Sequence, residues 1–166
     1  MLREVEELYG IRDRSFTILG IEFREGVPQI WFPGNCKHIA IQIGTGAMND
    51  VNKALFQLAH ECVHLLDPVL GGEASVLEEG LATNFSLIYA HRSNPSYETG
   101  NAKYDTANRR VEQLLSQHPD AIRHLREGGD RLSGFTVKKL ASHCTGLSAS
   151  EAEGLARQFH TWDGSA

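Results

Sequence analysis

Cysteine is scarce in this sequence, and so are long apolar runs. Its three cysteines, Cys36, Cys62 and Cys144, are an odd number at wide spacing, which does not provide a disulfide framework and is typical of a reducing compartment. No apolar run approaches the roughly 20 residues that cross a bilayer, and the acidic amino terminus lacks the apolar core of a signal peptide. These absences predict a cytoplasmic protein that does not contact a membrane.

An excess of positive charge is also absent. The sequence has 16 Lys and Arg against 21 Asp and Glu, a net charge of −5. Nucleic-acid-binding domains usually carry a basic surface, so we expect no nucleic-acid partner. A hydrophobic content of 41% is ordinary for a globular protein, and 166 residues are enough for one core. Residues 1–166 are therefore predicted to form a single domain.

The sequence does contain the segment His60-Glu61-Cys62-Val63-His64, which fits the pattern H-E-x-x-H. Residues four apart lie on one face of a helix, so the two imidazoles can bind one metal ion. The glutamate between them is placed to take a proton from a water that the metal activates. From about residue 49 to 67 the sequence has the period of an amphipathic helix. Its apolar stripe, opposite the histidines, consists of Leu55, Leu58, Ala59, Cys62 and Leu66.

A third metal ligand is expected on a neighbouring element, because catalytic zinc usually has three protein ligands and one open position. Ser75 and Glu78 fit an S-x-x-E capping box, which predicts the start of a second helix and a capping role for Glu78. Glu79 is then free to be the ligand. Glu73 is a weaker rival, because no helix fixes it. The buried face of the second helix is predicted to consist of Leu77, Leu81, Phe85 and Ile88.

H-E-x-x-H followed by E-G-L-A at residues 79–82 resembles the gluzincin metallopeptidases, over about residues 39–90. Their third ligand is a glutamate in an N-E-G-F-A or N-E-A type segment on the next helix. The resemblance implies a zincin-like fold, a peptide or protein substrate and Glu61 as general base. The small intracellular peptidases that cleave phage-type repressors are similar too. The zinc ligands implied by the resemblance are His60, His64 and Glu79.

This chain departs from the gluzincin pattern in two respects. Only fourteen residues separate His64 from Glu79, which indicates a minimal version of the family. Glu78 stands where the family often has asparagine, so the substrate-amine contacts of aminopeptidases are not supported.

The rest of the chain predicts an α+β fold, with a small N-terminal sheet packed on the metal helix and a helical C-terminal lobe. A short helix is expected at residues 2–9, with Val5 and Leu8 on one side. In gluzincins the strand before the metal helix forms the edge of the cleft and pairs with substrate, but an internal position suits its sequence equally well. Strands are predicted at 15–23, 29–32 and 38–44, and later helices at 104–116, 119–126, 136–143 and 150–160.

Several side chains are secondary candidates for the site. Asp67 lies on the metal face of the first predicted helix, where it would either accept a hydrogen bond from a ligand histidine or face solvent. The loop at residues 91–103 is a candidate rim. Tyr97, Tyr104 and His91 in or near this loop are candidate donors to an oxyanion.

Three functions are compatible with these residues. The leading hypothesis is a zinc-dependent peptidase with Glu61 as general base. The second is a non-catalytic, zinc-stabilised module that binds a protein partner or acts as a regulator. The third is a zinc hydrolase that acts on a non-peptide amide. The sequence is equally compatible with it, because the metal and the base would be the same.

Overall fold

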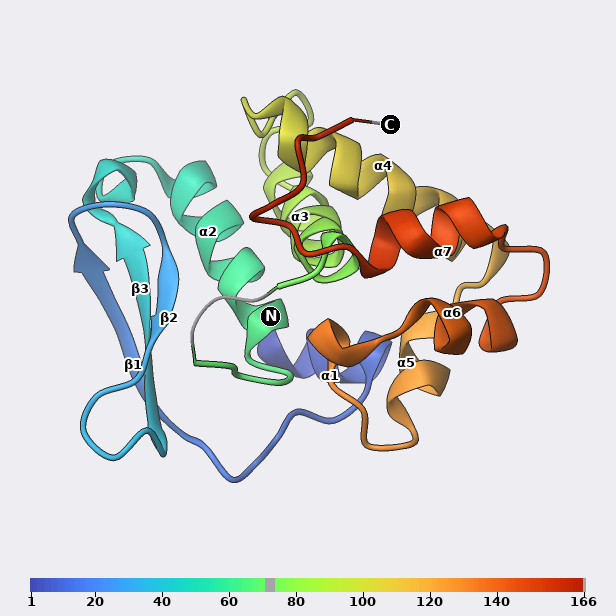
Figure 1. The fold of residues 1–166 in the computed structure, drawn as a ribbon. Coiled ribbons are helices and arrows are strands. Elements are labelled where there is room, and N and C mark those ends of the chain that lie inside the picture. Colours follow the sequence, from blue (N-terminus) through green and yellow to red (C-terminus); the bar gives the residue numbers. More distant parts are fainter. Residues whose placement is uncertain (71–73, 166) are drawn as a thin grey trace.

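The computed structural model describes residues 1–70 and 74–165. Within these residues, seven α-helices and three strands form an α+β architecture, which confirms the predicted class. The sheet lies on one side of α2 (Val51–His64), and the other long helices lie on the opposite side (Figure 1). No helix of the described residues is both long and apolar enough to cross a bilayer.

The three strands are β1 (Thr17–Arg24), β2 (Gln29–Trp31) and β3 (His38–Gly44), close to their predicted ranges. Their order is β1-β3-β2, with β1 parallel and β2 antiparallel to β3. Because β3 is paired on both sides, the internal position applies and an edge role for residues 38–44 is wrong. The short strand β2 is the sheet edge nearer to α2's histidines.

One face of the sheet packs on α2. Ile39, Ile41 and Ile43 alternate along β3, and all three are buried in a cluster that also contains Leu65 and the half-buried Leu58. The alternation places these isoleucines on one face of β3, and Ala40 and Gln42 on the other face are buried too. Helix α2 is therefore packed against the sheet on one side, as predicted.

Helix α2 begins at its cap Asp50, whose side chain accepts a hydrogen bond from the Lys53 amide. It ends at His64, three residues before the predicted end at 67. Leu65 packs in the sheet cluster and Leu66 in the main core, so tertiary packing turns the chain before Pro68 is reached. Cys62 is 4% exposed and unpaired, as predicted for a core thiol.

Helix α3 (Val76–His91) packs between α2 and α4 (Ala102–Gln117). Its predicted buried residues Leu77, Leu81 and Phe85 are buried, but Ile88 is 44% exposed. That part of the prediction is wrong because Tyr89 packs on Phe85 instead, with ring centroids 5.0 Å apart.

A glycine allows α4 to approach α3 closely. A Cβ atom at Gly80 would lie 2.4 Å from the carbonyl oxygen of Ala107. Gly80 follows Glu79 directly, so this close approach holds the first turn of α3 between α2 and α4.

The remaining elements are α1 (Leu2–Tyr9), the 3-10 helices η1 (Thr45–Ala47) and η2 (Leu132–Gly134), α5 (Ala121–Arg126), α6 (Val137–His143) and α7 (Ala149–Ala156). Ser148 and Glu151 form a capping box at the start of α7. In α1, Val5 is buried as predicted, but Tyr9 rather than Leu8 is the second buried residue.

Helix α7 ends four residues before the predicted end at 160. The chain then extends and pairs with the start of α3. The Val76 amide donates to the Arg157 carbonyl over 2.8 Å, and the Phe159 amide donates to the Ala74 carbonyl over 2.9 Å. This pairing replaces the last helical turn and holds the segment that leads to Glu79.

Candidate metal centre

The three predicted metal ligands come together between α2 and α3. His60 Nε2 lies 3.1 Å from Glu79 Oε2, and His64 Nε2 lies 3.6 Å from Glu79 Oε1. One ligand atom from each residue lies within 4.8 Å of the other two. The fold therefore brings together the residues that the sequence predicts.

This donor set fits a zinc ion. Zinc is bound by histidine nitrogen and carboxylate oxygen at about 2.0–2.2 Å, and tetrahedral geometry places such ligand atoms about 3.3 Å apart. The separations of 3.1 and 3.6 Å lie on either side of that value. Small movements of His60, His64 and Glu79 would complete the coordination.

Glu78 does not have the full capping role predicted for it. Ser75 Oγ accepts a hydrogen bond from the Glu78 amide over 3.2 Å, but the Glu78 carboxylate turns away from the cap. Its Oε1 lies 2.8 Å from His64 Nδ1. A carboxylate on the far nitrogen of a ligand histidine fixes the ring and its tautomer. The sequence offered no signal for this contact beyond the position of Glu78 beside Glu79.

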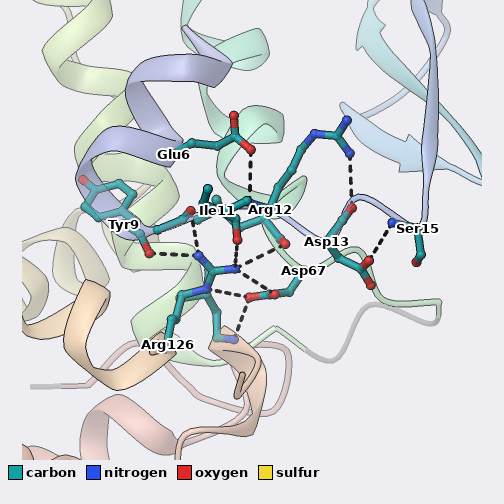
Figure 2. Close-up of polar contacts among 11 residues, drawn as sticks. Glu6, Tyr9, Ile11, Arg12, Asp13, Ser15, Asp67 and Arg126 are labelled. Carbon is teal, nitrogen blue, oxygen red and sulfur yellow. Dashed lines mark hydrogen bonds and ion pairs between the residues drawn. The ribbon is translucent and has the colours of Figure 1, made fainter. Parts of the chain in front are cut away.

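Asp67 neither contacts His60 or His64 nor faces solvent, so both predicted alternatives for it are wrong. Its carboxylate accepts hydrogen bonds from Arg126 Nε and Nη2 over 3.1 and 3.0 Å. It also accepts one from the Leu132 amide over 3.1 Å. Figure 2 shows Asp67 beside the Arg126 guanidinium. Since α2 ends at His64, Asp67 no longer lies one helical turn further along the metal face.

Glu61 is 3% exposed and lies on α2 between the two ligand histidines. Burial raises the pKa of its carboxyl above the ordinary value, and the charges of His64 and His60 only partly offset this. Within the described residues the histidines pair with Glu78 and Glu79 and not with Glu61. A carboxylate with a raised pKa is suited to accept and return a proton near neutral pH.

His64 and Glu79 form a strong ion pair in this cluster. Burial lowers the pKa of His64, but the Glu79 charge and the hydrogen bond with Glu78 outweigh burial and raise it to about 10. Burial raises the pKa of Glu79, but the His64 charge and the hydrogen bond with His60 outweigh it and lower it to about 2. A metal ion must therefore displace a proton from His64.

A cavity of about 720 Å³ contains the site, and Glu61, His60, His64 and Glu79 line it. Tyr97 from the predicted rim loop lines it too, which agrees with the rim role. Glu73 lies outside the described residues.

The candidate oxyanion donors differ in their positions. Tyr104 lines the cavity, with its ring centroid 5.9 Å from that of His60. Burial raises the pKa of Tyr104 to about 12, so its hydroxyl stays protonated as a donor. His91 does not line the cavity, and its Nε2 lies 3.0 Å from the Tyr97 carbonyl oxygen in the rim loop. The geometry thus favours the tyrosines over His91.

Comparisons of this chain with known protein families, curated proteins and solved structures find no match.

Proposed function

We propose that this protein is a zinc-dependent hydrolase, most specifically a peptidase, with zinc held by His60, His64 and Glu79. The observation that carries the proposal is the convergence of these three side chains in a cavity that Glu61 also lines. When bound, zinc would polarise the scissile carbonyl and lower the pKa of a water molecule.

The side chains around the metal position have distinct roles in this proposal. Glu61 takes a proton from the attacking water and delivers it to the leaving amine. Tyr104 donates a hydrogen bond to the oxygen on which negative charge develops. Glu78 touches neither substrate nor water and positions His64 through Nδ1.

A peptide is favoured over other amides by the sheet edge beside the metal centre. Gln29 and Ile30 of β2 line the cavity, and β2 is paired on one side only within the described residues. A free strand edge can bind the main chain of an extended peptide by strand addition. The backbone groups of a peptide are what such an edge recognises.

Glu61→Gln tests the proposal, because it preserves size and removes the base. A peptide library scanned by mass spectrometry supplies a substrate for the zinc-loaded protein. We expect the hydrolysis rate to fall by at least about 100-fold, with zinc content and thermal unfolding unchanged. Glu98→Gln is the matched control, since Glu98 is exposed on the rim loop.

Two results would contradict this function. Equal cleavage by the Glu61→Gln variant would show that the base is wrong. No cleavage by the zinc-loaded wild type across the library would instead favour a zinc-stabilised protein-binding module.

A further inference from the structure

The cavity is an elongated groove that follows α2. The residues of α2 that line it recur on every turn over one face of the helix, so they form a continuous stripe. With a rise of 1.5 Å per residue, the stripe is about 16 Å long. Its members are Lys53, Phe56, Gln57, His60, Glu61 and His64.

Two walls flank this stripe. On one side lie β2 and its flanking residues, including Ile30 and Phe32. On the other side lies the rim loop, which is attached to α2 by a hydrogen bond from Ser93 Oγ to Asn52 Oδ1 over 2.6 Å. Tyr97 also packs on Phe56, with ring centroids 5.2 Å apart. The groove therefore has α2 as its floor and the sheet edge and rim loop as its sides.

The ligand histidines lie inside the groove and not at its end. Lys53 is seven residues before His60, or about 10 Å along the helix axis. Beyond His64 the lining continues with Val69 and Ser133. An extended chain advances about 3.3 Å per residue, so about three substrate residues fit between the metal position and Lys53 alone.

The groove offers little that would recognise a chain terminus next to the metal. The Glu61 carboxylate beside the metal position would repel a terminal carboxylate there. A terminal ammonium would need a carboxylate with no other role, but Glu79 pairs with both histidines and Glu61 is the proposed base. Glu78 Oε1 is held by His64, and its Oε2, which has no hydrogen-bond partner among the described residues, is fully buried out of reach of a substrate.

Granted the proposed zinc-peptidase function, we infer that the substrate is an extended polypeptide cleaved at an internal bond, independently of either terminus. The main chain lies along β2, and an apolar side chain packs on Phe56, which lines the groove together with Tyr97. Phe56 lies one helical turn before His60, on the Lys53 side of the metal position, so it contacts a residue on that side of the scissile bond.

A peptide series tests the inference. One cleavable sequence is prepared at lengths from about four to ten residues, with ends free, acetylated, amidated or both blocked. We expect kcat/KM of the doubly blocked long peptide to lie within about threefold of the free one, because the ends bind nothing. Shortening to four residues should lower kcat/KM by at least about tenfold, because groove contacts are lost.

Variants identify the contacts. Phe56→Ala should lower kcat/KM by about tenfold or more for a substrate with an apolar residue on the Lys53 side, with zinc content retained. Tyr97→Ala should act in the same direction, because Tyr97 packs on Phe56, and it serves if Phe56→Ala disturbs His60. Lys53→Gln tests the one lysine or arginine among the described residues that line the groove. An effect confined to peptides with a free carboxyl end would show that Lys53 anchors that end and would overturn the inference.

Different results would contradict the zinc-peptidase function and the inferred cleavage of internal bonds. Cleavage only of peptides with a free amino or carboxyl end would overturn the inference and leave the zinc-peptidase function standing. No cleavage of any peptide by the zinc-loaded protein would overturn that function, and the inference with it.

Discussion

His64 and Asp67 are three residues apart in the sequence but belong to two different buried clusters of charged side chains. The cluster around Asp67 and Arg126, here called the Arg126 cluster, is closed. The Arg126 guanidinium donates to both Asp67 oxygens and to the carbonyl oxygens of Tyr9, Gly10 and Ile11 (Figure 2). The positive charge of Arg126 balances the negative charge of Asp67, and the guanidinium nitrogens have hydrogen-bond acceptors.

The charges of the candidate metal centre do not balance in this way. Three carboxylates, Glu61, Glu78 and Glu79, surround two histidines. Glu78 Oε2 has no hydrogen-bond partner among the described residues. A surplus of buried carboxylate is costly unless a cation completes it.

The comparison separates a closed cluster with balanced charges from an unbalanced one, which supports our proposal that the candidate metal centre binds a ligand. The Arg126 cluster joins the end of α1 and the turn after α2 to α5 through side-chain and backbone contacts. The metal centre has the perturbed pKa values and the cavity that mark a functional site. Four predictions test this difference, from the largest expected effect to the smallest.

Arg126→Met should destabilise the fold by about 3–5 kcal/mol, because it leaves Asp67 buried without its partner. The free energy of unfolding in urea measures the effect. Arg131→Met is the control, because Arg131 is exposed, and it should change stability by no more than about 0.5 kcal/mol. The folded fraction of Arg126→Met should still bind one zinc. A loss below about 1 kcal/mol would mean that the cluster does not stabilise the fold.

Glu79→Gln should abolish stoichiometric zinc binding, whereas Glu78→Gln should weaken zinc binding by about 10- to 100-fold. Glu79 supplies a ligand atom, while Glu78 acts through the His64 ring, and glutamine there keeps an acceptor but loses the charge. Competition with a chelator measures both affinities. If Glu78 served only as a cap, its variant would bind zinc like the wild type, and a reversed ranking would show that Glu79 is not the ligand.

Zinc binding should release a proton near pH 7, since His64 with a pKa of about 10 must become neutral. Zinc affinity should therefore rise between about pH 6 and 9. Calorimetry in buffers of different ionisation enthalpy measures the proton. Binding without proton release at pH 7 would contradict the assignment of His64 as a charged partner of Glu79.

The stability of the metal-free protein should fall at high pH, where zinc affinity is greatest, and should also fall at strongly acidic pH. The pKa of His64 is raised from 6.5 to about 10, so its contribution to stability is complete below pH 6.5 and is lost as the pH rises through 10. The pKa of Glu79 is lowered from 4.5 to about 2, so its contribution is complete above pH 4.5 and is lost as the pH falls through 2. Thermal unfolding of the metal-free protein should show both losses.

The sequence by itself determined the local parts of the site. The four-residue spacing of His60 and His64 placed both on one helix face. Ser75 marked the start of α3, and the period of Leu77 and Leu81 fixed the side from which Glu79 projects. These are properties of single helices, encoded within a few residues.

Only the tertiary structure decided which groups meet across elements. The contacts of Glu78 with His64 and of Asp67 with Arg126 join residues that are far apart along the chain. The central place of β3 and the early ends of α2 and α7 also depend on distant partners, such as the pairing of residues 157 and 159 with the start of α3. Helical and strand periods report which face of an element is buried, but not which side chain or strand covers it, because packing and hydrogen bonding select the partner only in the folded chain.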